Sequence, residues 1–391
     1  MGRNARFGWR KHGIPSAVAC LTVVLLGASC ASNDVDSSPR SGSPAGEVSA
    51  DVRSSVEIFT QKPKSIGIVE PLKQKPTGKS VAWIGVGTAN DNAAYGAFTE
   101  AASILGMEVQ NLQAGADAQK EARAIEQARS QGFDAVILSG LLTSSIGPQL
   151  QSLHDSGVKV LGYSTSLEGN SGPSIDFSFY SLPEARRFGS IAADWTMVDS
   201  SNDADVLVAY PPDIDAAVAQ RDGFVDRLSD QCPNCAVNDL EFSMSELGST
   251  LPSRIVSAVQ ANPNINYLYG VFGASFVGVP EALQQAGVAD RIRGVTVGGI
   301  PANMQQIADG KVLAASLDQG LHYRGYMLAD ALGRLFAGQE VPVDVYHGFD
   351  MPVQLHTADN IDFNPDLEWS GEPTDFREQF VALWGSETSH G

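Results

Sequence analysis

Residues 81–86 read VAWIGV, and three further apolar runs follow at regular intervals: MEVQNL (Met107–Leu112), AVIL (Ala135–Leu138) and VKVLGY (Val158–Tyr163). Between these runs lie stretches with the periodicity of amphipathic helices, at 93–105, 116–130 and 143–155. Continuous apolar strands that alternate with amphipathic helices are typical of a parallel sheet covered by helices on both faces. The first half of the chain therefore predicts a doubly wound α/β lobe.

A second series of the same kind follows, with strands expected at 205–209, 236–242, 265–271, 292–297 and 312–317. The helices of this series are expected at 215–228, 251–261, 275–286 and 323–336, after an opening helix that starts at the capping-box pattern Ser181-Leu182-Pro183-Glu184. The sequence thus predicts two doubly wound parallel-sheet lobes joined by crossover strands. Ligands of such sheets bind beyond the carboxyl ends of the strands, so we expect a cleft between the lobes.

These patterns also predict the domain boundaries. We expect an N-terminal lobe of residues 80–180 plus about 320–347, and a C-terminal lobe of 181–319 plus about 348–371. Residues 372–391 are expected to form a C-terminal tail.

The first 29 residues have the features of a signal peptide: a basic head, a short apolar run at 14–26, and Gly27-Ala28-Ser29. The apolar run is too short to span a membrane. Cys30 stands where a lipoprotein is acylated, although Gly27 replaces the larger aliphatic residue usual in lipoproteins. Ordinary cleavage with an incidental Cys30 is the alternative, and either route predicts export.

Residues 31–53 are mostly Ser, Asp, Gly, Pro and Ala. Such a segment buries too little apolar surface to offset the entropy of ordering it. We therefore expect residues 30–79 to form a disordered, lipid-anchored tether that holds the lobes at the outer face of the cytoplasmic membrane.

The chain has 45 acidic and 26 basic residues, with a formal net charge of −19. This charge and the lack of a basic run argue against nucleic-acid binding. Cys232 and Cys235 are expected to form a disulfide outside the cytosol. The alternative is a thiol–disulfide oxidoreductase, but the pair follows a predicted helix, whereas reactive cysteines usually precede one.

No catalytic or cofactor motif is complete. Gly85-Val86-Gly87 resembles the start of a dinucleotide-binding loop, but Asn90 replaces the third glycine. Gly162-Tyr163-Ser164-Thr165-Ser166 lacks the closing glycine of a nucleophile elbow. The six histidines show no metal-binding spacing. We therefore expect no enzymatic activity, no cofactor and no metal.

Polar residues follow the first predicted strand, in Thr88-Ala89-Asn90-Asp91-Asn92. Such residues are good helix N-caps, so a structural role and a ligand-binding role both remain open. Gln319 follows the strand at 312–317, where the chain is expected to cross back between the lobes.

Five segments, in order, resemble the ribose-type periplasmic binding proteins: Gly132-Phe133-Asp134-Ala135-Val136-Ile137-Leu138, Gln220-Arg221-Asp222-Gly223-Phe224, Asn262-Pro263-Asn264-Ile265, Ala308-Asp309-Gly310-Lys311-Val312-Leu313-Ala314-Ala315-Ser316 and Ala358-Asp359-Asn360-Ile361. The resemblance covers about residues 80–362. It implies a monomeric solute-binding protein that delivers a small molecule to an ABC importer. A sensory binding protein for a membrane receptor is the alternative.

The predicted strand ends, the resemblance and the available aromatic residues together give an expected ligand site at Asn90, Asp91, Tyr95, Ser139, Ser164, Thr165, Phe272, Gly299 and Gln319. Sugar-binding members carry an Asp-Arg pair where this chain has Ser164-Thr165, and only the Gln at 319 is matched. Aromatic residues are available for an apolar pocket instead: Tyr95, Tyr163, Phe177, Phe179, Phe272 and Phe276. The expected ligand is sugar-like, or less hydroxylated with aromatic character.

Overall fold

The computed structural model describes residues 46–115, 117–140, 146–164, 167–169, 171–342, 352–361 and 371–385. The expected signal peptide, Cys30 and Thr165 lie outside the described residues. Within the described part, no helix is both long enough and apolar enough to cross a membrane.

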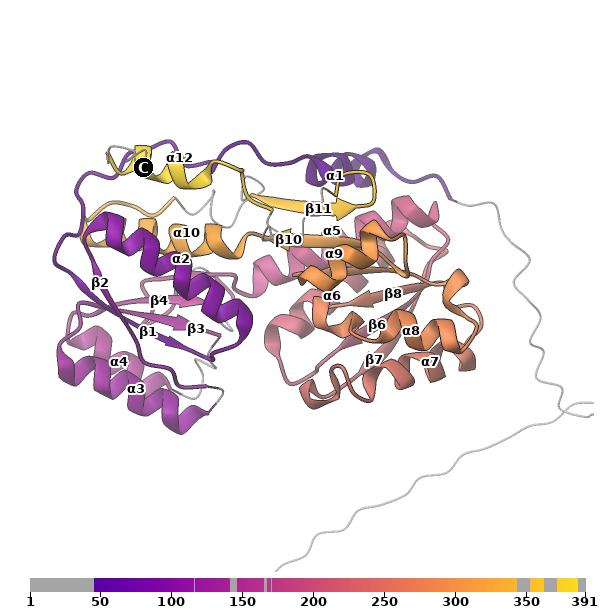
Figure 1. The fold of residues 1–391 in the computed structure, drawn as a ribbon, viewed down its shortest axis with the longest axis horizontal. Helices are drawn as coiled ribbons and strands as arrows, with labels where there is room; N and C mark the ends of the chain where they lie inside the picture. Colours follow the sequence, from indigo (N-terminus) through magenta and orange to yellow (C-terminus); the bar gives the residue numbers. More distant parts are fainter. Residues whose placement is uncertain are drawn as a thin grey trace, which may run out of the picture. The chain divides into compact units, whose positions relative to one another are not determined.

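The first sheet has five parallel strands in the order β2-β1-β3-β4-β5. Figure 1 labels β1, β2, β3 and β4 of this sheet. The strands are β1 Ser80–Gly85, β2 Glu108–Asn111, β3 Ala135–Ser139, β4 Lys159–Tyr163 and β5 Phe177–Phe179. One face packs against α2 (Ala89–Leu105) and α10 (Leu321–Phe336). The other face packs against α3 (Ala118–Gln131) and α4 (Gly147–Asp155). Alternate side chains of each strand enter opposite cores, because successive residues of a strand point to opposite faces.

The second sheet has six strands in the order β11-β10-β9-β8-β6-β7, and only β11 is antiparallel to its neighbour. The strands are β6 Asp205–Tyr210, β7 Ala236–Glu241, β8 Tyr267–Gly270, β9 Arg293–Val297, β10 Leu313–Gln319 and β11 Val353–Thr357. One face is covered by α5 (Leu182–Ser200) and α6 (Asp215–Gln231). The other face is covered by α7 (Leu251–Ala261), α8 (Val279–Gln285) and α9 (Pro301–Ala308). Short 3₁₀ turns lie at η2 Met244–Glu246, η3 Gly273–Phe276 and η4 Ala289–Arg291.

The fold class is confirmed: two doubly wound parallel-sheet lobes, with crossings between them. The prediction of one continuous helix at 275–286 is wrong in detail. The segment is divided into η3 and α8 at Gly278, whose φ of 77° lies in the left-handed region that interrupts a helix. The predicted tail also contains an ordered element, α12 (Phe376–Leu383), whose Phe376 and Phe380 are buried in the N-terminal lobe.

The prediction of a disordered tether is wrong for residues 46–79. Ala50–Thr60 form α1, with Ser49 as N-cap, and Val52 and Phe59 are buried in the C-terminal core. Ile66, Ile68 and Leu72 are buried in the N-terminal core. Six apolar residues of this segment are buried, namely Val48, Val52, Phe59, Ile66, Ile68 and Leu72, and their burial outweighs its polar average composition.

This N-terminal segment contacts both lobes (Figure 1). On the C-terminal lobe, the Asn360 amide donates to the Thr60 carbonyl at 2.9 Å. On the N-terminal lobe, the Tyr323 hydroxyl donates to the Ile66 carbonyl at 3.1 Å. The main chain itself passes between the lobes from Tyr180 to Ser181 and again at Gly320, after β10.

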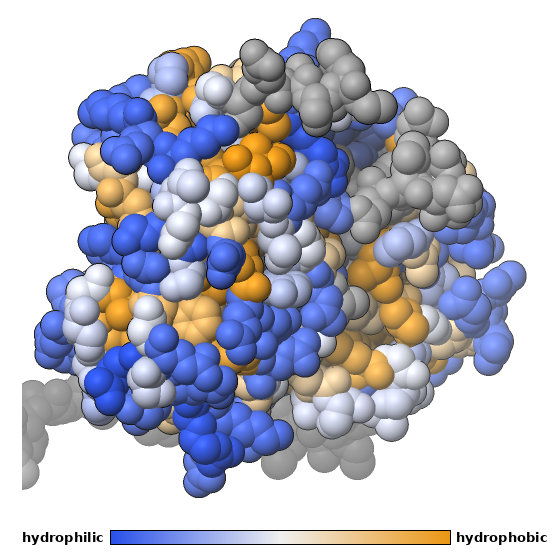
Figure 2. All heavy atoms as spheres, turned by 60° about the vertical axis from the view of Figure 1, so that its left-hand side comes forward, coloured by the Kyte–Doolittle hydropathy of each residue, from blue (hydrophilic) through white to orange (hydrophobic). Residues whose placement is uncertain are grey.

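Figure 2 shows one face of the molecule, on which most protruding residues are hydrophilic. Large apolar side chains that are exposed in the described part are few: Ile58, Val69, Met244 and Val277. Of these four, Met244 is distinctive because it is 42% exposed and lines the cavity described next.

Candidate functional site

A cavity of about 460 Å³ lies between the two lobes, at the carboxyl ends of their parallel strands. The N-terminal lobe contributes residues that follow or end β1, β3 and β4, and the C-terminal lobe contributes residues that follow β7 and β8 and that end or follow β9. The volume lies within the usual range for small-molecule sites, roughly 300–1,000 Å³. This arrangement is a consequence of topology, because the strands of each lobe all end on the cleft side.

Asp91 lies in the first turn of α2 and is 5% exposed. Its carboxylate accepts the Trp83 indole N–H at 3.1 Å and the Gly87 backbone N–H at 2.8 Å. A side chain at Gly85 would meet this carboxylate within 2.3 Å, so glycine is required there. Asp91 therefore holds the β1–α2 loop in place, and only a small part of the residue is accessible from the cavity.

Three further polar residues of the N-terminal lobe line the cavity: Asn90, Ser139 and Ser164. Ser139 ends β3 and is 2% exposed. Ser164 follows β4 with a φ of 55°, a conformation that is uncommon for a residue other than glycine. Its backbone N–H donates to the Phe179 carbonyl at 3.0 Å, which holds the loop after β4 against β5.

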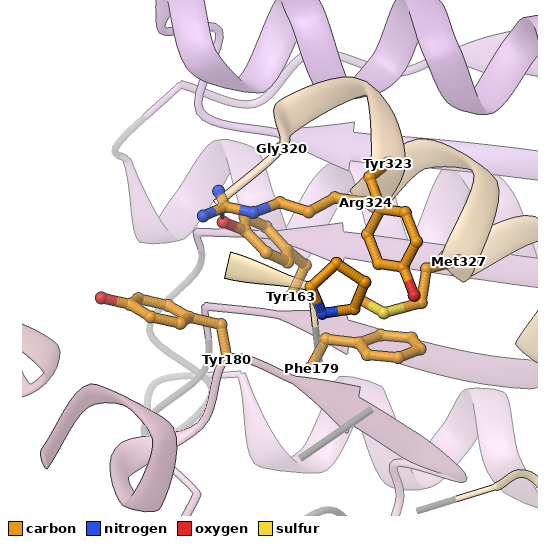
Figure 3. Close-up of a pocket in the computed structure, with 8 residues that line it drawn as sticks. Tyr163, Phe179, Tyr180, Gly320, Tyr323, Arg324 and Met327 are labelled. Atoms are coloured by element: carbon orange, nitrogen blue, oxygen red, sulfur yellow. Dashed lines mark hydrogen bonds between the residues drawn. The ribbon is translucent and has the colours of Figure 1, made fainter. Parts of the chain in front are cut away.

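Arg324, in the first turn of α10, extends toward Tyr163 of the N-terminal lobe and Tyr180 of the first crossing (Figure 3). Its guanidinium donates to the Tyr163 hydroxyl. The guanidinium carbon lies 5.0 Å from the centre of the Tyr163 ring and 5.7 Å from that of Tyr180. Burial raises the pKa of the Tyr163 phenol, and Arg324 opposes that shift. The phenol stays neutral at neutral pH and therefore gives the arginine no counter-charge.

Tyr180 connects the two lobes at the first crossing. Its φ of 52° again lies in the left-handed region, so this bulky residue is strained. The Gln220 amide from α6 donates to its hydroxyl at 2.7 Å, and the same Gln220 accepts the Tyr269 hydroxyl at 3.2 Å. Burial raises the pKa of Tyr180 well above its usual range. The crossing is therefore tied to the C-terminal lobe by a neutral hydrogen-bonded chain.

The C-terminal wall of the cavity is largely apolar: Met244, Leu247, Val271, Phe272, Val297 and Ile300. Phe272 follows β8 and is half-buried, and Ile300 precedes α9. Behind this wall lies Asp318, whose carboxylate accepts the Gly299 N–H at 2.6 Å. Burial raises the pKa of Asp318, while nearby His356, whose pKa is itself lowered by burial, opposes that rise.

The sequence matches the family described as the periplasmic binding protein domain over residues 81–340. The matched span includes all five strands of the first sheet and five of the six strands of the second. The chain belongs to this family.

Solved structures of similar fold include several periplasmic binding proteins. An ABC sugar transporter subunit from Rhodobacter sphaeroides is 22% identical with a TM-score of 0.63, covering 73% of this chain and 99% of its own. A periplasmic solute-binding protein of an ABC transporter from Actinobacillus succinogenes, with bound D-allose, is 14% identical with a TM-score of 0.63 and covers 72% of this chain and 98% of its own.

A fructose-binding periplasmic domain of a hybrid two-component system also has this fold. It is 14% identical with a TM-score of 0.61, and covers 72% of this chain and 92% of its own. A search of curated protein sequences found no match.

The periplasmic binding protein fold brings five of the expected site residues to the cavity: Asn90, Asp91, Ser139, Ser164 and Phe272. Tyr95 packs against Trp83 in the N-terminal core instead, with ring centres 5.7 Å apart. Gly299 lies one residue beyond Gly298, which lines the cavity. Gln319 ends β10 and pairs with Val353, but its side chain lies outside the described part, as does Thr165.

Of the aromatic residues considered for the pocket, Tyr163 and Phe272 line the cavity. Phe177 and Phe179 form β5 and are buried in the N-terminal core, and Phe276 is fully buried in the C-terminal core. A recess of about 10 Å³ beside the cavity, lined by Phe179 and Tyr323 among others, holds at most a single water (Figure 3).

Four residues that shape the site were not predicted from the sequence: Tyr180, Gln220, Met244 and Arg324. Gln220 stands in one of the segments that carry the family resemblance, but no role was inferred for it. Arg324 lies on a helix that follows the second crossing, and its distance in sequence from the other site residues hides it. An arginine five residues after Gln319, in a chain expected to cross there, was the available signal.

The expected disulfide is present between Cys232 and Cys235, directly after α6. Cys232 is 1% exposed. Within the described residues, no group of three or more His, Cys, Asp or Glu side chains is placed to hold a metal ion.

Proposed function

We propose that this protein captures a small molecule in the cavity between its lobes outside the cytoplasm and delivers it to an ABC importer. The single observation that carries the proposal is the cavity of about 460 Å³, lined by strand ends of both lobes. Because residues of both lobes line the cavity, a ligand makes all of its contacts only when both lobes are close to it. Binding therefore favours the closed arrangement, which a permease can distinguish from the open one.

The family and the neighbouring structures support a transport role. Two of the similar structures are named as parts of ABC transporters, one of them a sugar transporter and the other with D-allose bound. The ligand we propose is sugar-like, or less hydroxylated with apolar surface. The apolar residues of the C-terminal wall favour a less hydroxylated ligand with apolar surface, because burying apolar surface on both sides stabilises the complex.

A sensory role is the second candidate, because a fructose-binding domain of a two-component system has the same fold. In that case the closed state would act on a membrane receptor instead of a permease. Deleting the gene separates the two roles. Loss of uptake of the labelled ligand supports transport, while intact uptake with loss of the transcriptional response supports sensing.

The exported thiol–disulfide oxidoreductase is disfavoured by the position of the disulfide. Cys232 follows the last residue of α6 and is buried, whereas reactive cysteines usually stand exposed at a helix N-terminus.

The membrane anchor is part of the proposal. Acylated Cys30 would hold the protein at the outer face of the membrane, and two acyl chains suffice where one is marginal. The variant Cys30→Ala should move the protein from the membrane fraction to the soluble fraction. Cys20→Ala is the matched control, since it lies in the leader. Unchanged membrane association of Cys30→Ala would contradict the anchor.

The binding function is tested with the purified full-length protein in a thermal-shift screen over sugars, polyols, aromatic compounds and organic acids. A ligand at 100 times its Kd adds about 2.7 kcal/mol to the free energy of unfolding. Hits are then measured by calorimetry with the wild type and with Phe272→Ala. The proposal fails if no solute in the screen raises the unfolding temperature, or if Phe272→Ala leaves the affinity of every hit unchanged.

A further inference from the structure

The two charged side chains that face the cavity differ in whether other residues of the protein already bind them. Among the described residues that line it, Arg324 is the only cation and Asp91 the only carboxylate. Asp91 already accepts hydrogen bonds on both of its oxygens, from Trp83 and from Gly87. A ligand therefore meets one engaged carboxylate and one arginine.

Arg324 has no ion-pair partner among the described residues. Its side-chain hydrogen bond and ring contacts are to Tyr163 and Tyr180, which are neutral. Its charge opposes the raised pKa of buried Asp318, but no ion pair joins the two described residues. A shortage of acidic residues does not explain why Arg324 has no ion pair among the described residues, since the chain has 45 acidic residues against 26 basic ones.

Other arginines of the chain do pair with carboxylates. Arg186, Arg227 and Arg293 lie 2.8, 2.7 and 2.6 Å from their acidic partners. The contrast indicates that the charge of Arg324 is held available at the cavity. Its orientation is fixed by Tyr163, so little side-chain entropy remains to be lost when an anion binds.

We propose, building on the binding function above, that the ligand carries a carboxylate that binds Arg324, on a body with an apolar face that packs against the C-terminal wall. The planar guanidinium matches a carboxylate in geometry and forms charge-assisted hydrogen bonds with it. One arginine neutralises one carboxylate, whereas a phosphate at neutral pH would retain excess negative charge. Met244, Leu247 and Phe272 offer contact surface to the body and no hydrogen bonds from their side chains.

The test uses two matched pairs of probes with the full-length protein: 3-phenylpropanoate against 3-phenyl-1-propanol, and glucuronate against glucose. The members of each pair have closely similar bodies and differ in the carboxylate. We expect at least one acid to bind about 10- to 100-fold more tightly than its neutral partner, because hydrogen bonds to charged groups contribute that much. Calorimetry at low and at moderate salt gives the Kd values.

Variants then assign the preference to Arg324. In Arg324→Gln the acid should bind about 10- to 100-fold more weakly, with the neutral partner unchanged, and Arg324→Lys should restore part of the preference. Arg123→Gln, an exposed residue of α3, is the control for the same change of net charge. Thermal unfolding confirms that each variant is folded, and Arg324→Lys serves if the Gln variant does not fold.

The failures of this inference and of the binding function are distinguishable. If a neutral probe, or a neutral hit of the wider screen, binds through Phe272 and is insensitive to Arg324→Gln, the carboxylate proposal is overturned and the binding function stands. If the probes do not bind but the screen yields another carboxylate whose affinity falls in Arg324→Gln, the proposal is supported. If no solute of any class binds, the binding function itself fails.

Discussion

The two lobes share one architecture but present different surfaces to the cleft. The N-terminal lobe contributes mostly polar or charged residues, namely Thr88, Asn90, Asp91, Ser139, Ser164 and Arg324, beside Val86, Gly140 and Tyr163. At the equivalent strand ends, the C-terminal lobe contributes mostly apolar residues, namely Met244, Leu247, Val271, Phe272, Val297 and Ile300. Topology determines where the site lies. The residues at and beyond the strand ends determine what it binds, because their identity is not constrained by packing in the core.

The lobes also differ in how they are held together internally. In the C-terminal lobe, α5 and α6 cross so closely that a Cβ at Gly223 would lie 1.9 Å from the Arg186 carbonyl oxygen. In the N-terminal lobe, α2 and α10 cross at Gly325, where a Cβ would lie 2.4 Å from the Phe98 nitrogen. The described disulfide lies in the C-terminal lobe. The same layered design is thus stabilised by different local contacts in each lobe.

The largest effect should come from the N-terminal segment that both lobes share. Phe59 in α1 is 3% exposed in the C-terminal core, so Phe59→Ala should lower the free energy of unfolding by about 3–5 kcal/mol. Ile66→Ala should cost about 2–4 kcal/mol in the N-terminal core. Urea unfolding followed by tryptophan fluorescence measures both variants.

Ile58, the neighbour of Phe59, is 59% exposed and provides the control. Ile58→Ala should change the stability by no more than about 0.5 kcal/mol. If Phe59→Ala is as mild as this control, then α1 does not belong to the folded C-terminal lobe, and the segment behaves as the tether that its composition predicts.

The helix crossings give the next effect. Gly223→Ala should destabilise the protein by about 3 kcal/mol, since the new methyl group meets backbone that cannot move independently. Gly325→Ala should cost somewhat less because its nearest backbone atom is farther away. Chemical denaturation of each variant measures the difference between the lobes.

Gly96, an exposed residue of α2, is the matched control, because a methyl group added there would have nothing within 4 Å. Gly96→Ala should stabilise the protein by about 0.5–1 kcal/mol through helix propensity. Equal costs at positions 223 and 325 would show that the two crossings are equally tight in solution.

The cleft walls themselves are compared through ligand affinity. Phe272→Ala should weaken binding of any solute found in the screen by about 1.5–3 kcal/mol, because it removes a large part of the apolar wall. Asn90→Ala, on the rim of the polar wall, should cost about 1 kcal/mol or less, the usual net contribution of a neutral hydrogen bond. Calorimetry decides, and a larger loss at Asn90 would reverse our ranking of the walls.

Much of the fold was accessible from the sequence because its periodic signals are strong. The apolar runs at 81–86 and 135–138 became β1 and β3, within a residue or two at each end. The N-terminal segment was misjudged because composition averages over a window, whereas burial depends on single positions. Val52, Phe59 and Ile66 are few among polar neighbours, yet each enters a core.

The site could be predicted only in part from the sequence. The ends of strands can be recognised there, but residues that are distant in sequence and adjacent in space cannot. Asn90 and Phe272 follow predicted strands and were expected in the site on that basis, and both line the cavity. Arg324 is 161 residues from its partner Tyr163, so no local pattern joins them. Tyr180 was missed because β5 has three residues, too few for a period to appear.

The smallest effect should come from the disulfide of the C-terminal lobe. The bond closes a loop between residues three apart in sequence, so it restricts the unfolded chain little. The double variant Cys232→Ser/Cys235→Ser should therefore lose about 1–2 kcal/mol of stability, below the usual range for longer loops. The Sγ of Cys232 lies 3.4 Å from the Asn202 carbonyl oxygen, so a serine hydroxyl there has an acceptor within reach.

Neither cysteine lines the cavity, so ligand affinity should be unchanged in the double variant. Denaturation with and without reductant measures the stability of the wild type, and the double variant should be insensitive to reductant. A thiol titration and an insulin-reduction assay complete the test. Catalytic disulfide exchange by the wild type, lost in the double variant, would mean that this pair has a redox role and that the C-terminal lobe carries a second function which the N-terminal lobe lacks.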